Sequence, residues 1–389
     1  MLIPLLPRRG IHLGTDSPGQ YTLSNEALRR ARLRRQLLAP GSNAGSGAEV
    51  VRRLCALQAQ EWPSAQLAIH ARCPGVSQTD VVHAREVERA FVLTWTLRGT
   101  LHLVPAADLH WLLELCAPAA IRGSMSRYRQ LGLTEDARAR GLEAIQAVLS
   151  REGALNRPQL AQALESRGVP VAGQAIHHLV RYAALRGLVC FGPELDGNLS
   201  YVLLDDWLPE KDAASHPAEP LSELARRYLW AYAPATMADF ARWSGLSKAQ
   251  VRHAWEAVAA DCAAVGIPDG EALMLCEQLA ATESAPGEPV VRLLPRYDSY
   301  LLGYASRAFM VADAHAKRVH PGGGLIRACV VIDGEARASW KLEKRRAGIR
   351  AKVAPYESLS EAETAQLEVE VAALGGFFNS NAALQIDSA

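Results

Sequence analysis

Lysine is scarce in this chain of 389 residues. The six lysines are at positions 211, 248, 317, 341, 344 and 352, so the first two hundred residues contain none. A Schiff-base nucleophile is commonly a lysine, and arginine cannot replace it because the guanidinium stays protonated. We therefore expect no amine chemistry from the N-terminal half of the chain, which leaves Lys317 or the N-terminal amine as sources.

Closely spaced cysteine pairs and long apolar segments are also absent. The seven cysteines are odd in number, widely spaced and never arranged as Cys-x-x-Cys, which argues against a disulfide framework or a structural zinc. The apolar run from Leu2 to Leu6 is too short for a signal peptide or a membrane span. We expect a cytoplasmic protein with reduced cysteines, no bound metal and no membrane partner.

The composition is that of a folded protein, with 49% hydrophobic and 21% charged residues. Its length predicts two to four modules. The net charge of +1 is unevenly spread: residues 1–60 hold nine arginines against three acidic residues, and residues 341–352 hold six cations against Glu343. We interpret these stretches as two candidate phosphate-facing patches, with solvated faces as the alternative.

Three stretches share a pattern of helices followed by β-rich runs, which is typical of a winged-helix unit. The first has predicted helices at 24–38, 48–57, 64–72 and 79–90 and β-rich runs within 91–104. The second has helices at 134–150, 157–167 and 171–185 and β-rich runs at 188–191 and 199–204. The third has helices at 221–231, 237–243 and 247–258, and its turn at 244–246 is typical of a helix-turn-helix.

The chain changes character near residue 271, where short β-rich segments begin. They lie at 272–276, 290–294, 326–332, 336–342 and 348–353 and predict a small barrel or sheet, followed by a helix at 360–374 and a frayed tail after Asn379. The predicted fold class is α+β: three tandem winged-helix units and a small C-terminal β-barrel-like domain. The expected domains are 20–130, 131–208, 221–270 and 271–375, with a Pro- and Ala-rich linker at about 209–220.

Gln58 and Gln60 lie where the predicted 48–57 helix ends, because Pro63 prevents that helix from continuing. If the backbone is extended there, both amides point to one side. Two neutral amides can orient a water molecule without a negative charge, which suits a reaction whose leaving group departs easily. The alternative is that both glutamines are ordinary helix-end residues facing solvent.

The β-rich runs at 91–104 turn at Arg98-Gly99 and are expected to fold back on the preceding helices. The residues that would then lie close to the glutamines are Thr96, Arg98, Thr100 and His102. For His102, a half-buried strand histidine is the competing interpretation, because Leu101 and Leu103 flank it. Asp298 and Arg296 either approach this site or brace the C-terminal domain, and we favour bracing.

Three motifs resemble the tandem winged-helix DNA glycosylase family, which includes the azinomycin-resistance glycosylase. They are Leu57 to Gln60, Leu97 to Val104 and Leu293 to Tyr304, within a resemblance that covers about residues 20–370. The family's catalytic residues lie in a motif such as Gln-x-Gln or Gln-x-Asp, so the resemblance implies that Gln58 and Gln60 are catalytic here. The Gln-x-Gln version resembles the branch linked to self-resistance against DNA-alkylating antibiotics.

The resemblance implies a monofunctional DNA glycosylase that releases N7-alkylated guanine from double-stranded DNA and needs no cofactor. It implies a basic DNA-facing surface lined by the winged helices and a hairpin of the barrel that probes the minor groove. We predict a monomer whose DNA contacts come from arginine, lysine, threonine and histidine side chains. They are Arg52, Arg53, Thr96, Arg98, His102, Arg307, Lys317 and Arg318.

Two other functions compete with the glycosylase hypothesis: a non-catalytic winged-helix regulator and a protein that binds lesions or the drug itself. A regulator would be expected to carry a basic recognition helix. The predicted helix at 247–258 has only Lys248, Arg252 and His253, so it weakly disfavours sequence-specific DNA recognition.

Overall fold

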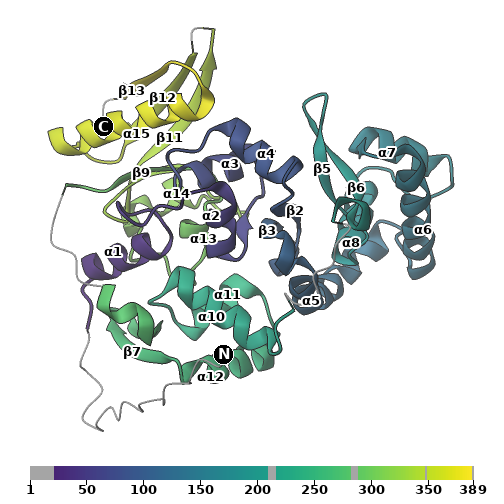
Figure 1. Cartoon of the computed structure of the whole chain (residues 1–389), viewed down its shortest axis with the longest axis horizontal. Helices are drawn as coiled ribbons and strands as arrows, with labels where there is room; N and C mark the ends of the chain where they lie inside the picture. The colour runs from purple at the N-terminus through teal and green to yellow at the C-terminus, as the bar shows by residue number, and fades with distance from the viewer. Residues whose placement is uncertain (1–21, 209–215, 282–287, 347, 388–389) are drawn as a thin grey trace, which may run out of the picture.

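The computed structural model describes residues 22–208, 216–281, 288–346 and 348–387. The N-terminal arginines Arg8 and Arg9, residues 209–215 of the expected linker and Lys211 lie outside these ranges. Helices and strands are mixed throughout the described chain, as the α+β prediction requires. In Figure 1 the early helices occupy the centre, with later parts of the chain on three sides of them.

After an opening helix, the first part of the chain contains a helix, a short strand, two helices and a hairpin, and a long helix follows. Ser24 caps the opening helix through the Ala27 N–H, as the sequence predicts. Strand β3 lies between β1 and β2 in a three-stranded antiparallel sheet. The elements are α1 (Asn25–Arg35), α2 (Gly47–Leu54), β1 (Leu57–Gln58), α3 (Trp62–His70), α4 (Gln78–Glu86), β2 (Phe91–Trp95), β3 (Leu101–Pro105) and α5 (Leu109–Gln130).

The second part repeats this order on the right of Figure 1. Its sheet also places the last strand in the middle, in the order β4-β6-β5. The hairpin turns at Asp196 and Gly197, which both have positive φ, as a tight hairpin turn requires. The elements are α6 (Glu135–Glu152), β4 (Leu155–Asn156), α7 (Arg157–Glu165), α8 (Ala175–Leu185), β5 (Val189–Leu195), β6 (Asn198–Leu203) and α9 (Leu204–Trp207).

The third part follows the same order with a single residue as its first strand. Ala235 exchanges both backbone hydrogen bonds with Leu273, at 3.1 and 2.8 Å. Leu273 belongs to the last strand, so the predicted β segment at 272–276 pairs here and not with the C-terminal sheet. The elements are α10 (Pro220–Tyr232), α11 (Met237–Ser244), α12 (Lys248–Ala259), β7 (Cys262–Ile267) and β8 (Gly270–Leu275).

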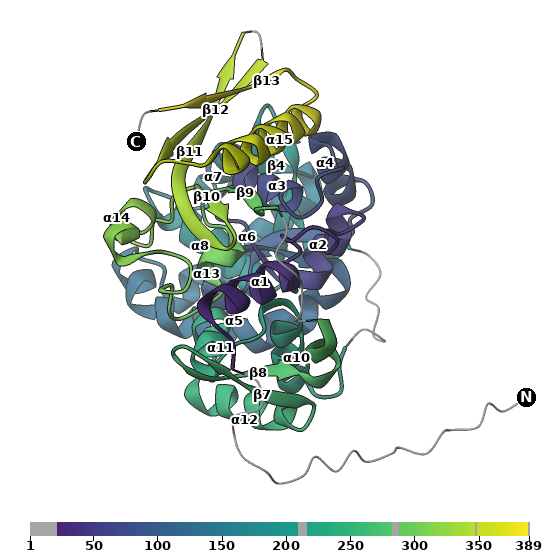
Figure 2. The ribbon, with the colours of Figure 1, turned by 90° about the vertical axis from the view of Figure 1, so that its left-hand side faces the viewer.

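The C-terminal part is a five-stranded sheet with one helix across it, which Figure 2 shows edge-on. The strand order is β13-β12-β11-β10-β9, and no pairing among the described residues closes it into a barrel. Its elements are β9 (Val291–Leu294), α13 (Ser299–Leu302), α14 (Ala316–Val319), β10 (Cys329–Ile332), β11 (Glu335–Arg345), β12 (Gly348–Pro355), α15 (Glu361–Phe378) and β13 (Ala382–Ile386). The expectation of a frayed tail is therefore wrong, because the tail forms β13, parallel to β12.

The two faces of this sheet pack against different cores, because side chains alternate along a strand. Val330 and Ile332 of β10 join a small cluster with Leu367 and Val371 of α15. Cys329 and Val331 face the main core, which contains buried apolar residues from all three helical parts. The helical parts and one face of the C-terminal sheet thus share one continuous core, and the other face forms a second core with α15.

A buried ion pair crosses that core. The Arg72 Nη1 and Nη2 atoms lie 2.8 Å from Asp298 Oδ2 and Oδ1, and both side chains are fully buried. Arg72 also donates to Gln36 Oε1 at 3.1 Å, and Asp298 Oδ1 accepts from the Tyr300 N–H at 2.8 Å. The preferred bracing role of Asp298 is confirmed by this pair.

We expect Asp298→Ala to lower the free energy of unfolding by about 3–5 kcal/mol, because it leaves the Arg72 charge buried without its partner. Urea unfolding measures this change. The control is Glu277→Gln, which breaks the ion pair of Glu277 with Arg226. Both of these side chains are half-exposed, so the free energy of unfolding should change by less than about 1 kcal/mol. Equal losses in the two variants would show that burial of the pair is unimportant.

Candidate active site

The chain is extended at Gln58, which is one of the two possibilities left open by the sequence, and helix α2 ends earlier than predicted. Helix α2 ends at Leu54 because Cys55 has φ of 63°, outside the helical region. Leu57 and Gln58 then pair with Leu103 and His102, and the Ala59 N–H continues the ladder to the Leu101 carbonyl at 2.8 Å. The segment therefore adds a third strand to the β2–β3 hairpin, next to β3.

The two glutamines differ in exposure. Leu57 and Ala59 belong to the main core, so Gln58 between them faces the other way, and Gln60 follows in a bend after the strand. Gln60 is exposed, whereas Gln58 is only 8% exposed. The expectation of two solvent-facing helix-end residues is wrong for Gln58, which is a buried polar residue at the edge of an accessible turn.

Gln58 is held by two residues distant in sequence. Its backbone N–H donates to Ser299 Oγ at 3.2 Å, and its side-chain Oε1 accepts from Arg98 Nη2 at 2.9 Å. Ser299 directly follows the buried Asp298, at the start of α13. The third family-like motif thus contacts the first one directly.

The hairpin turn at Arg98 is held in turn by the second and third helical parts. Arg181 of α8 donates from Nε to the Gly99 carbonyl at 2.9 Å. Arg98 Nη1 donates to the carbonyl of Trp243, near the end of α11. Gln58 is therefore linked to α13 directly, and to α8 and α11 through the Arg98-Gly99 turn.

The sequence comparisons identify the family to which this arrangement belongs. A sequence profile described as "DNA glycosylase AlkZ-like" matches residues 51–377. An "Interstrand DNA cross-link repair glycosylase" of Streptomyces sahachiroi is 31% identical over 336 residues, which are 80% of this chain and 86% of that protein. The chain belongs to the AlkZ-like DNA glycosylase family.

A solved structure agrees with this assignment. The Streptomyces sahachiroi DNA glycosylase AlkZ superposes with a TM-score of 0.77 at 25% identity, covering 94% of this chain and all of that one. The predicted family and the predicted enzyme class, a hydrolase of N-glycosyl bonds, are thereby confirmed. The roles of individual residues are not settled by these matches.

Two residues predicted to contact DNA are inside this glycosylase. Thr96 is 0% exposed and His102 is 1% exposed, because the hairpin face that carries them is covered by the rest of the fold. In this structure neither side chain is presented to DNA, contrary to expectation. His102 also departs from its half-buried alternative, since it is fully buried.

The remaining predicted DNA contacts have different surroundings in the AlkZ-like chain. Lys317 and Arg318 of α14 are exposed, and Arg52 of α2 is exposed beside Glu49. Arg53 packs over the Trp230 ring, and Arg307 donates from Nε to the Leu301 carbonyl at 2.8 Å. The first three are thus accessible cations, whereas Arg53 and Arg307 are partly held by the protein.

Sequence analysis missed Arg242, an exposed residue of α11. Its charge lowers the pKa of both Arg98 and Arg307, after the larger effect of burial, so it lies near both guanidinium groups. No ion pair of Arg242 occurs within the described ranges of the chain. A local sequence pattern did not reveal it, because its proximity to the glutamine turn depends on the packing of α11.

Arg296 approaches the glutamine turn, and does not brace the sheet as we had favoured. Its Nη1 lies 2.8 Å from Glu61 Oε1, in the residue directly after Gln60. Ser64 donates its hydroxyl to the other oxygen of Glu61 at 3.1 Å. The carboxylate nearest to Gln60 in sequence is therefore paired with a cation.

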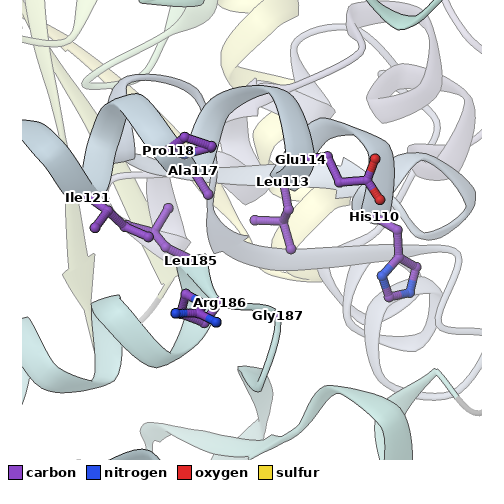
Figure 3. A pocket seen from close by; sticks show the side chains of 9 residues that line it. All are labelled: His110, Leu113, Glu114, Ala117, Pro118, Ile121, Leu185, Arg186 and Gly187. Carbon is purple, nitrogen blue, oxygen red and sulfur yellow. The ribbon is translucent and has the colours of Figure 1, made fainter. Parts of the chain in front are cut away.

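Three pockets of the described part of this glycosylase lie away from the glutamine turn. One, of 440 Å³, lies between α5 and the end of α8, with Leu113, Glu114 and Arg186 on its walls (Figure 3). Two smaller pockets lie at the start of α2 and between α11 and α12. Over the described ranges, no group of histidine, cysteine and acidic residues is arranged to hold a metal ion, and no helix is long and apolar enough to cross a membrane.

His102 makes stability depend on pH. Burial, with a further effect of the Arg98 charge, lowers the pKa of His102 to about 3 despite its contact with the Thr100 carbonyl. Because the unfolded chain takes up this proton near pH 6.5 and the folded chain does not, stability should fall as pH drops from 6.5 towards 3.

We expect this residue alone to remove about 2 kcal/mol of unfolding free energy between pH 8 and pH 5. Urea unfolding at the two pH values measures the loss, and His102→Asn should reduce it by that amount. An unchanged pH dependence in the variant would show that His102 is protonated in the folded protein.

Proposed function

We propose that this DNA glycosylase hydrolyses the N-glycosidic bond of N7-alkylated guanine in duplex DNA, with Gln58 and Gln60 orienting the attacking water. The observation that carries the proposal is the Gln-x-Gln segment, in which Gln58 is fixed at the end of β1 and Gln60, two residues later, is exposed. A fixed amide next to an accessible amide can position a small polar molecule between protein and DNA.

The neutral character of the two glutamines suits this substrate. Alkylation at N7 gives guanine a positive charge, so the base leaves as a neutral molecule and needs little acid catalysis. The task left to the protein is to hold water below the anomeric carbon and to tolerate an oxocarbenium-like sugar. Amide oxygens accept hydrogen bonds from water, and each has two lone pairs for this purpose.

The buried histidine does not replace the missing acid. The pKa of His102 lies far below neutral pH, so this side chain stays uncharged under ordinary conditions. Glu61 is engaged by Arg296 and Ser64. These contacts support a mechanism that depends on a good leaving group, and thus on a charged base.

We further propose that exposed cations around the turn bind the DNA backbone. Exposed Arg242 lies near Arg98 and near the half-buried Arg307, and Lys317 and Arg318 are exposed on α14. At the β11–β12 hairpin, Lys344 and Arg346 are exposed, whereas Glu343 pairs with Lys341 and Arg345. This hairpin is our candidate for the element that probes the minor groove.

The repeated helix, strand, two-helix and hairpin order supports three winged-helix units, of which the third continues through β8 to Leu275. We propose that a monomer acts on DNA in the cytoplasm. The relative named as an interstrand cross-link repair glycosylase supports a bulky substrate. Gln60 stands where the broader crosslink-unhooking branch is expected to have aspartate, so we propose self-resistance to a genotoxic natural product as the physiological role.

Purified protein should release N7-methylguanine or a bulkier N7 adduct from duplex DNA and leave an alkali-labile abasic site. We expect Gln58→Ala and Gln60→Ala each to lower the single-turnover rate by roughly 10²-fold, while affinity for lesion DNA changes little. Product release and fluorescence anisotropy measure the two quantities. Parallel losses of rate and affinity in both variants would assign the glutamines to binding or folding.

We predict that the enzyme stops at the abasic site, because no lysine precedes residue 211 and the glutamine turn lies at residues 58–60. Borohydride reduction during turnover should therefore trap no covalent protein–DNA product. A trapped product that disappears in Lys317→Ala would instead place an amine nucleophile at the site.

A further inference from the structure

The Arg98 backbone has an unusual conformation for a long side chain. Its φ is 54°, in the left-handed region, and Gly99 follows with φ of 65°. A non-glycine residue in this region is uncommon and is kept only where surrounding contacts enforce it. The Arg181 hydrogen bond to the Gly99 carbonyl provides one such contact from the second helical part.

Helix α11 holds the Arg98 side chain in place from the other side. Gly245, the left-handed residue that ends α11, leaves room for it: a Cβ built there would lie 2.6 Å from Arg98 Cγ. The Trp243 carbonyl accepts from Nη1. The guanidinium therefore reaches Gln58 along one defined path, and its charge is directed into the protein instead of towards solvent.

The chemistry of this contact fixes the direction of the Gln58 amide. A guanidinium has only donors, so the amide must present its oxygen to Arg98, and the reversed orientation would place two donors against each other. A hydrogen bond from a charged donor is stronger than one between neutral groups. The second lone pair of Oε1 and the Nε2 hydrogens then point in known directions.

We propose that Arg98 is a positioning residue, which fixes the rotamer and amide orientation of Gln58 for the water that attacks the sugar. The proposal deepens the function given above and rests on it for the catalytic consequence. It differs from the DNA contact expected from sequence, because Arg98 acts through Gln58 and not on a phosphate. The amide also separates the Arg98 charge from the positive charge that develops on the sugar.

A double-mutant cycle tests this role. We expect Arg98→Met to lower the single-turnover rate on N7-methylguanine duplex by roughly 10- to 100-fold, with less than about a twofold change in Kd. Because Arg98 acts through Gln58, the double variant with Gln58→Ala should be no slower than Gln58→Ala alone. Arg98→Lys should restore part of the rate, since lysine can donate to either Gln58 or the Trp243 carbonyl.

The matched control is Arg151→Gln, which removes an exposed arginine on α6 paired with Glu152 and should leave both rate and Kd unchanged. Urea unfolding of each variant checks that it is folded. Independent rate losses that multiply in the double variant, or a loss of affinity equal to the loss of rate, would overturn the proposal and favour a direct DNA contact.

A measurement without DNA separates this inference from the proposed substrate. In protein labelled with ¹⁵N-glutamine, the Gln58 side-chain NH₂ signals are assigned by their disappearance in Gln58→Ala. We expect resolved, slowly exchanging signals in the wild type and shifted, averaged signals in Arg98→Met. Unchanged signals would refute the positioning role whatever the enzyme's activity, whereas the expected change without any base release would refute only the proposed substrate.

Discussion

The buried pair between Arg72 and Asp298 holds together the parts of the chain on which the glutamine site depends. It joins the end of α3 to the start of α13, residues 226 positions apart. Asp298 also accepts from the Tyr300 N–H and so fixes the turn that contains Ser299. The Ser299 hydroxyl oxygen in turn accepts a hydrogen bond from the Gln58 N–H. This buried charged pair thereby helps to set the position of β1, which leads to the exposed glutamine turn.

The glutamine turn is therefore a product of tertiary structure more than of local sequence. Strand β1 has only two residues, and its contacts come from β3, α13 and the β2–β3 turn. A strand this short has too few residues to be stable by itself, so the pairing must be supplied by the surrounding core. This explains how a polar side chain such as Gln58 can be buried at its end: Arg98 satisfies the amide oxygen that burial would otherwise leave unpaired.

Sequence patterns predicted the elements that depend on periodicity and turn residues. Ser24 capping and the hairpin at Asp196-Gly197 were both accessible in this way. The end of α2 at Cys55 was not, because a cysteine with positive φ leaves no pattern. The inward path of Arg98 was also hidden, since the carbonyl it contacts lies 145 residues later. The same limit applies to β13, whose few residues become a strand only by pairing with β12.

In a site without charged catalytic groups, selectivity for the substrate depends on how easily the base departs. Gln58 and Gln60 carry no charge, His102 is uncharged at neutral pH, and Glu61 is paired with Arg296. An unmodified guanine needs a proton to leave, and none of these groups is arranged to supply one. A base that already carries a positive charge needs only an oriented water and a sugar geometry that the site tolerates. Under the proposed mechanism, intact DNA is spared because its uncharged bases are poor leaving groups.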